Sequence, residues 1–290
     1  MLLQQIINGL TIGGIYALVA LGYSMVYSIL RIVNFAHGDI FMMGTFFGLT
    51  LCQVMHMPFW VSLIVAAALT AVLGLTVERL AYRPIHSKDG LSVLISALGV
   101  SIFLQNLARM IWGSETFPYE GKMKTVSYNI GSISISNINI IIFVLVIVLL
   151  CALYLVIYKT KIGVAMRASS HDMKTARLMG INTNKVIVLT FGIGSVLAAV
   201  AGNLVGIYYD AVYASMGYSM GLKAFAAAIL GGIGSIPGAV IGGILIGVVE
   251  SLGTAYLSSG YRDAYAFIVM ILFLIIRPSG ILGKKVNEKV

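Results

Sequence analysis

Long apolar stretches alternate with short polar connections along the whole chain. The apolar segments cover residues 5–27, 37–56, 58–78, 91–112, 138–158, 187–208, 222–236, 238–256 and 263–277. Most approach the ~20 residues that an α-helix needs to cross a hydrocarbon core of about 30 Å. Lipid cannot form hydrogen bonds with the N–H and C=O groups of the backbone, so a spanning segment must satisfy them internally. The pattern therefore predicts an all-α polytopic membrane protein. We expect one transmembrane domain over residues 1–290, a helical bundle with about eight or nine membrane segments.

The composition supports a membrane location and argues against a nucleic-acid partner. Hydrophobic residues make up 59% of the chain, charged residues only 10%, and the mean hydropathy is +0.99. Soluble domains carry about 25% charged residues. The net charge of +9 is spread over short loops between apolar segments and forms no single basic face. Sorting of positive loops to the cytoplasm accounts for this distribution.

The positions of Lys and Arg predict which loops face the cytoplasm. Most lie after the first and third apolar segments, in residues 159–186, and at the C-terminus. One membrane topology places all of these on one side, with the N-terminus outside and the C-terminus inside. This topology requires residues 221–252 either to cross the membrane twice or to form a re-entrant pair. The two alternatives remain open.

The stretch 221–252 is rich in glycine and contains a natural break. Three glycines precede Pro237, whose missing N–H suits the first turn of a new helix. Glycines at four-residue intervals let helix backbones approach closely in a membrane. We assign close helix packing to Gly234, Gly238, Gly242 and Gly247. A broken helix that lines a pathway is the alternative, and both can hold.

The longest outward connection, residues 113–137, predicts a small β-hairpin. Apolar and polar residues alternate on both sides of Gly131. An extracytoplasmic hairpin either docks an external partner or caps the bundle.

The motifs of enzymes and ATPases are missing from the sequence. It contains no phosphate-binding loop, no paired-cysteine or histidine metal motif and no serine-hydrolase motif, so we expect no enzyme, no metal site and no bound cofactor. Asp39 and Glu250 are the two carboxylates expected in or near the membrane. Two such groups are too few to argue for a proton-coupled carrier.

The polar run 159–186 contains six Lys and Arg and has the features of a short helix. Ser169 followed by Asp172 matches a capping box, and Gly180 suits the end of a helix reaching about Met179. Met173, Ala176 and Met179 then form an apolar stripe suited to docking. The alternative is a solvated basic loop produced by charge sorting alone, which requires neither caps nor a stripe.

Four blocks of the sequence resemble a known family. They are "KIGVAMRASSHDMKTARLMGINTNKVIVLTFGIGSVLAAVAGNL", "RIVNFAHGDIFMMGTF", "LGGIGSIPGAVIGGILIGVVES" and, more weakly, "VERLAYRPIH". Together they are similar to the permease subunits of branched-chain amino acid ABC transporters of the LivH/LivM type, and closer to the LivH-like half.

The resemblance implies a permease in the cytoplasmic membrane, without its own ATPase, that imports branched-chain amino acids. Its partners would be a second homologous permease, cytoplasmic ATP-binding subunits that use the ATP, and an extracytoplasmic solute-binding protein. An importer of urea or short amides in the same family is the alternative, followed by an ATP-independent channel or secondary carrier.

The resemblance also implies roles for particular residues. The loop 159–186 would couple to the ATPase through Gly163, Arg167, Ala168, Asp172, Ala176 and Gly180. Asn34, His37, Asp39 and Glu250 are candidates for the translocation path. Asn34 is expected to cap the second helix. For His37 and Asp39, local structure at the start of that helix is the alternative to a role in the path.

Overall fold

The computed structural model describes residues 1–85, 90–119, 125–130 and 133–283. Each of the nine apolar segments corresponds to a helix. These helices are α1 (Leu2–Leu30), α2 (His37–Gln53), α3 (Phe59–Val77), α4 (Gly90–Trp112), α5 (Asn137–Lys159), α8 (Thr183–Tyr209), α9 (Met216–Gly231), α10 (Ile236–Tyr256) and α11 (Arg262–Ile276). Seven helical segments in the described ranges are long and apolar enough to cross a membrane. The 17-residue α2 and the 16-residue α9 are shorter.

Short elements complete the fold. A π-helical turn, Glu78–Tyr82, extends α3, and a 3₁₀ turn, Ser259–Tyr261, precedes α11. Between α5 and α8 the chain forms α6 (Lys161–His171) and α7 (Met173–Leu178). The strands β1 (Ser127–Ile130) and β2 (Ile133–Ser136) pair antiparallel, with Tyr128 opposite Ile135. The predicted β-hairpin is therefore confirmed.

The bundle has a buried centre and an apolar outer layer. Most residues of α1, α2 and α8 are buried, as are the small residues on the inner faces of α9 and α10. Helices α4, α5 and α11 instead expose much of their apolar surface. Such exposed apolar faces suit lipid or a membrane partner. The arrangement confirms the predicted polytopic helical bundle.

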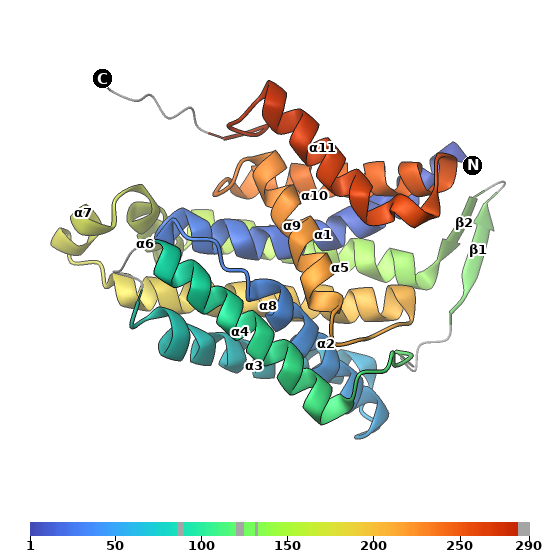
Figure 1. Cartoon of the computed structure of the whole chain (residues 1–290), viewed down its shortest axis with the longest axis horizontal. Helices are drawn as coiled ribbons and strands as arrows, with labels where there is room; N and C mark the ends of the chain where they lie inside the picture. Colours follow the sequence, from blue (N-terminus) through green and yellow to red (C-terminus); the bar gives the residue numbers. More distant parts are fainter. Residues whose placement is uncertain (86–89, 120–124, 131–132, 284–290) are drawn as a thin grey trace.

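The two ends of the bundle differ, as Figure 1 shows. The hairpin and the N-terminus lie at one end, and α6 and α7 project at the other. Gln4 ties the first turn of α1 to the hairpin, because its side-chain amide exchanges two 2.9 Å hydrogen bonds with the backbone of Ser134. At the opposite end, the guanidinium of Arg31 donates to the carbonyl of Ser170 in α6.

Helices α2 and α9 meet inside the bundle. A Cβ built on Gly38, in the first turn of α2, would lie 2.3 Å from the carbonyl oxygen of Gly217 in α9. His37 packs against Gly22, which lies about 12 Å along α1 from its last residue at 1.5 Å per residue. The chain thus returns into the bundle after α1 before α2 begins (Figure 1).

The predicted break in the glycine-rich region is confirmed. Gly232 and Gly234 adopt φ angles of 102° and 86°, which side-chain-bearing residues rarely adopt, and they separate α9 from α10. The hydroxyl of Ser235 accepts a 3.2 Å hydrogen bond from the N–H of Gly238 and caps α10. Helix α9 begins at Met216, six residues before the expected start of that segment.

The four assigned glycines occupy different environments. Gly234 lies in the turn, in ordinary contact with Ser28 of α1, whereas the other three are in α10. Added Cβ atoms on Gly238, Gly242 and Gly247 would lie 2.3, 2.1 and 2.3 Å from backbone atoms of neighbouring helices. For Gly238 and Gly242 the neighbour is α9, and for Gly247 it is α1. Three glycines thus let α10 touch two helices.

Candidate functional sites at the loop helices and around Glu250

Helix α6 is fixed to the end of α5. The hydroxyl of Thr160 caps α6 by accepting a 3.1 Å hydrogen bond from the N–H of Gly163. A Cβ on Gly163 would lie 2.1 Å from the carbonyl oxygen of Ile157, so glycine alone permits this close turn. Arg167 donates to the same carbonyl, and its guanidinium lies 5.3 Å from the ring centroid of Tyr158. These contacts make α6 a rigid extension of α5.

The expected helix from Ser169 to Met179 is wrong in its boundaries. Ser169 is a buried residue inside α6, and Asp172 interrupts the helix with an extended backbone at φ −153°. The Asp172 carboxylate then caps α7, because it accepts hydrogen bonds from the N–H of Lys174 and the hydroxyl of Thr175. These hydrogen bonds, chiefly that from Thr175, lower the pKa of Asp172. The capping motif was therefore misplaced by three residues.

Helix α7 exposes two large apolar side chains. Leu178 is 87% exposed and Met179 is 78% exposed, while Ala176 is buried and Met173 is half-buried. Of the other assigned residues, Ala168 is half-buried, and Gly180 is exposed with a φ of 83°. The predicted stripe therefore splits, since Met173 and Ala176 face the chain and Met179 faces outward. Leu178 was not among the assigned residues, although its place beside Met179 was visible in the sequence.

Polar residues near the start of α2 are buried. Asn34, His37 and Asp39 are each at most 2% exposed. The expected cap by Asn34 is wrong: α2 begins after Ala36 without a side-chain cap, and the Asn34 side-chain oxygen accepts from the Tyr82 hydroxyl instead.

Several polar atoms of these side chains lack a hydrogen-bond partner within the described part of the chain. His37 lies against Tyr23 with ring centroids 4.8 Å apart, and Asp39 faces Ser101 and Gln105 of α4. Yet Asn34 Nδ2, His37 Nε2 and Asp39 Oδ1 have no hydrogen-bond partner among the described residues. Buried groups of this kind are costly unless water or a ligand satisfies them.

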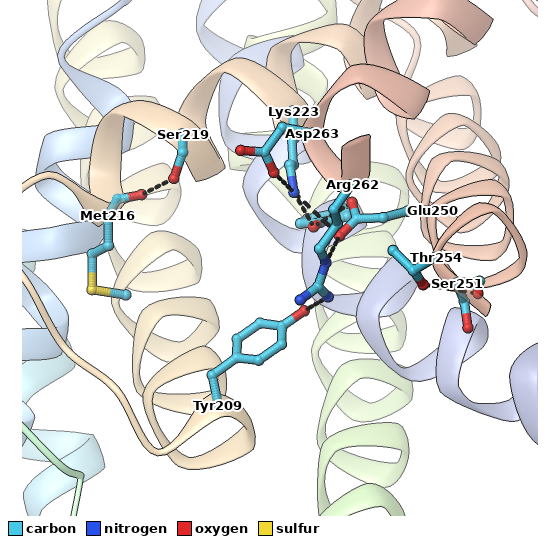
Figure 2. A network of polar contacts seen from close by, with 10 residues as sticks. Tyr209, Met216, Ser219, Lys223, Glu250, Ser251, Thr254, Arg262 and Asp263 are labelled. Carbon is cyan, nitrogen blue, oxygen red and sulfur yellow. Dashed lines mark hydrogen bonds and ion pairs between the residues drawn. The ribbon is translucent and has the colours of Figure 1, made fainter. Parts of the chain in front are cut away.

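Glu250 is the centre of a buried ion-pair cluster (Figure 2). Its fully buried carboxylate accepts a 2.8 Å hydrogen bond from Tyr16 and pairs with Lys223 Nζ at 3.1 Å and Arg262 Nε at 2.5 Å. Lys223 also pairs with Asp263 at 2.6 Å, and Arg262 donates to the hydroxyl of Tyr209. We call these six residues the Glu250 cluster. It joins helices α1, α8, α9, α10 and α11.

Most of this cluster was not predicted from the sequence. Glu250 was expected in or near the membrane and as a path candidate, whereas Lys223, Arg262 and Asp263 had no predicted role. Lys223 was the available signal, because a lysine inside an apolar helix needs a partner. The position of Arg262 and Asp263 at the start of α11 gave no sign that they turn toward α9 and α10.

The structure brings together only some of the four path candidates. Asn34, His37 and Asp39 lie around the start of α2, whereas Glu250 lies in α10 in its own cluster. A cavity of about 270 Å³ adjoins the Glu250 cluster. It is lined by Val205, Tyr209, Ala211, Tyr213, Met216, Ser219, Met220, Lys223, Arg262 and Asp263.

These features define an integral membrane protein with buried ion pairs and a basic segment projecting from one end. A family model described as the permease component of the branched-chain amino acid transport system matches residues 5–276. The chain belongs to this permease family, which confirms the resemblance.

Curated relatives match over nearly the whole chain. The high-affinity branched-chain amino acid transport system permease protein LivH of Salmonella typhimurium is 43% identical, covering 99% of this chain and 97% of the relative. BraD of Pseudomonas aeruginosa, described in the same words, is 43% identical over 99% and 98% of the two chains. A probable LivH from Methanocaldococcus jannaschii is 32% identical over 97% and 92%.

One solved structure is similar in fold. PsaBC from Streptococcus pneumoniae in complex with Fab has a TM-score of 0.50 and 13% sequence identity, covering 94% of this chain and 89% of the other. At this identity the likeness concerns the fold alone.

Proposed function

We propose that this chain is the membrane permease subunit of an ATP-binding cassette importer for branched-chain amino acids. The near full-length similarity to LivH and BraD carries this proposal. The chain acts in the cytoplasmic membrane with a second permease subunit, cytoplasmic ATP-binding subunits and an extracytoplasmic solute-binding protein. The chain supplies the passage and binds no cofactor, and its partners hydrolyse the ATP.

The N-terminus lies outside and the C-terminus inside in this proposal. Two observations support the orientation. The N-terminus lies at the hairpin end, while α6 and α7 project from the other end with most of the basic residues of their segment (Figure 1). Basic loops favour the cytoplasmic side.

The ATP-binding subunits dock on residues 159–186, where Leu178 and Met179 provide an exposed apolar contact. The assigned coupling residues act in different ways. Gly163 and Arg167 hold α6 on α5, Asp172 and Gly180 set the bounds of α7, and Ala168 and Ala176 pack these helices against the chain. A movement of the docked subunit would thus be transmitted to α5 as a rigid-body displacement.

The path proposal includes Asn34, His37, Asp39 and Glu250. The unpartnered atoms of the first three support it, because passing water or substrate would satisfy them. Glu250 belongs to the path through the cavity beside its cluster.

Reconstitution tests the proposed function. The chain is placed in proteoliposomes with its second permease, ATP-binding subunits and solute-binding protein, and uptake of radiolabelled leucine is measured. We expect uptake only when ATP is available to the ATP-binding subunits. Uptake without ATP, or none with the complete system, would contradict the proposal.

A matched pair of substitutions tests the docking surface. Met179→Asp should prevent the ATP-binding subunits from copurifying, because a charge would replace an apolar contact. Leu257→Asp is the control, since Leu257 is also 78% exposed but follows α10 at the hairpin end. Equal copurification with both variants would remove this surface from the proposal.

A further inference from the structure

The cavity beside the Glu250 cluster has one charged wall and one apolar wall. Arg262, Asp263 and Lys223 line the first, and Val205, Met216 and Met220 line the second. Figure 2 shows Arg262 and Asp263 at the start of α11, across from Met216 and Ser219 of α9. The volume of about 270 Å³ lies just below the ~300–1,000 Å³ of pockets for drug-sized ligands. The cavity therefore suits a smaller molecule.

The charged wall offers contacts of both signs. The Nε and one terminal nitrogen of Arg262 bind Glu250 and Tyr209. The other terminal nitrogen carries two of the five N–H donors of a guanidinium, and no described residue accepts a hydrogen bond from it, so it can receive a carboxylate. Asp263 contacts Lys223 through Oδ1, and its side chain is 65% exposed. Its second oxygen is positioned to accept from an ammonium group.

We propose that this cavity binds a free α-amino acid with an apolar side chain. The ligand carboxylate lies on Arg262, the ammonium lies on Asp263, and the side chain lies against Val205, Met216 and Met220. This inference rests on the proposed function and locates a binding site within the permease itself. The site lies toward the hairpin end, since Val212 in the adjoining loop pairs with Phe117 and α10 ends nearby.

The balance of charges favours a zwitterion over a simple ion. An anion alone would meet one like charge, at Asp263, and a cation alone would meet two, at Lys223 and Arg262. A zwitterion places its carboxylate on Arg262 and its ammonium on Asp263, so each of its charges meets an opposite charge. Because Glu250 already binds Lys223 and Arg262, the ligand need not break the buried pairs to enter. The cluster thus holds the charged wall in place before the ligand arrives, which reduces the cost of binding.

Protection of an introduced cysteine tests the site. Ser219→Cys places a thiol on the cavity wall, in a Cys151→Ala background because Cys151 is exposed. The permease pair with its ATP-binding subunits is held in nanodiscs without the solute-binding protein, and labelling by a small thiol reagent is followed. The Cys151→Ala parent, which retains the buried Cys52, gives the background.

Three probes separate the contacts: leucine, isocaproate, which lacks the ammonium, and isoamylamine, which lacks the carboxylate. We expect leucine to slow labelling at concentrations about tenfold lower than either analogue, as the loss of a charged hydrogen bond implies. Asp263→Asn should raise the leucine concentration for half-protection about tenfold, whereas that for isocaproate should fall, because this anion no longer meets a like charge. Asp210→Asn is the matched control, because Asp210 is an exposed carboxylate at the end of α8 that does not line the cavity.

The outcomes separate this inference from the proposed function. Equal protection by all three probes would overturn it, because the cavity would then recognise only apolar bulk. Absence of protection by leucine, with normal ATP-dependent uptake in the reconstituted system, would overturn the site and leave the proposed function intact. Protection by leucine with no uptake by the complete system would support the site and contradict the proposed function.

Discussion

Two charged regions of this protein are built in opposite ways. In residues 159–186 the basic side chains are mostly exposed, and the helices there are capped by groups close in sequence, Thr160 for α6 and Asp172 for α7. Around Glu250 the carboxylate and the Lys223 ammonium are buried, and the residues of the cluster come from five helices. The caps of the first region therefore come from residues next to the helices that they begin. The second exists only once the bundle is assembled.

The difference has an energetic meaning. Exposed charges are solvated and contribute little to stability. A buried charge costs several kcal/mol to desolvate, and its partners must offset that cost. The loop helices are therefore suited to contact a partner, and the Glu250 cluster links helix positions to one another. Substitutions in the two regions should separate effects on stability from effects on docking.

The largest effect is expected from Glu250→Gln. This change leaves Lys223 and Arg262 without their buried anion, and removing one partner of a buried pair costs about 3–5 kcal/mol. Thermal unfolding in detergent measures the loss. Asp263→Asn is the comparison, because that carboxylate is 65% exposed and should cost less than about 1 kcal/mol. Similar losses for the two variants would contradict the distinction between buried and exposed charges.

An intermediate effect is expected from Gly163→Ala, which tests how firmly the loop segment is attached to α5. The added Cβ would lie 2.1 Å from the carbonyl oxygen of Ile157, so α6 must shift at a cost of about 1–3 kcal/mol. We expect ATP-dependent uptake to fall more than copurification of the ATP-binding subunits, since α7 remains available. Ala165→Gly, on the same helix, is the control, with unchanged uptake expected. Normal uptake by Gly163→Ala would show that this attachment does not transmit movement.

The smallest effect is expected at Asp172. Replacement by Ala removes the cap of α7 and should raise hydrogen exchange of the α7 amides severalfold, with little change in global unfolding. Asn retains capping ability and should keep most of the protection. If both variants exchange like the unchanged chain, the carboxylate does not hold α7.

The same carboxylate predicts a pH dependence. Because its hydrogen bonds lower the pKa of Asp172 in the folded chain, the cap stabilises α7 above the unfolded pKa of this group. Protection should then be lost as the pH falls through the lowered folded pKa. Loss of protection as the pH rises would have the wrong sign.

Local order explains which predictions from the sequence held. The nine apolar segments all became helices, and the hairpin followed from alternation around Gly131. Both signals depend on neighbouring residues. The predicted capping box was wrong because the same residues allow two helix boundaries. In the structure Ser169 lies inside α6, and Asp172 alone caps α7. Sequence spacing cannot decide between them when burial of Ser169 depends on packing.

By itself, the sequence determined that the chain is a helical membrane protein, the approximate positions of its nine long helices, and the family to which it belongs. Apolar length and local turn chemistry specify those features, and both are carried by contiguous residues. Only the tertiary structure decided that Lys223, Glu250, Arg262 and Asp263 form one cluster and that Arg167 is bound to the end of α5. A buried charge requires a partner, but the helix that supplies it is chosen by how the bundle packs.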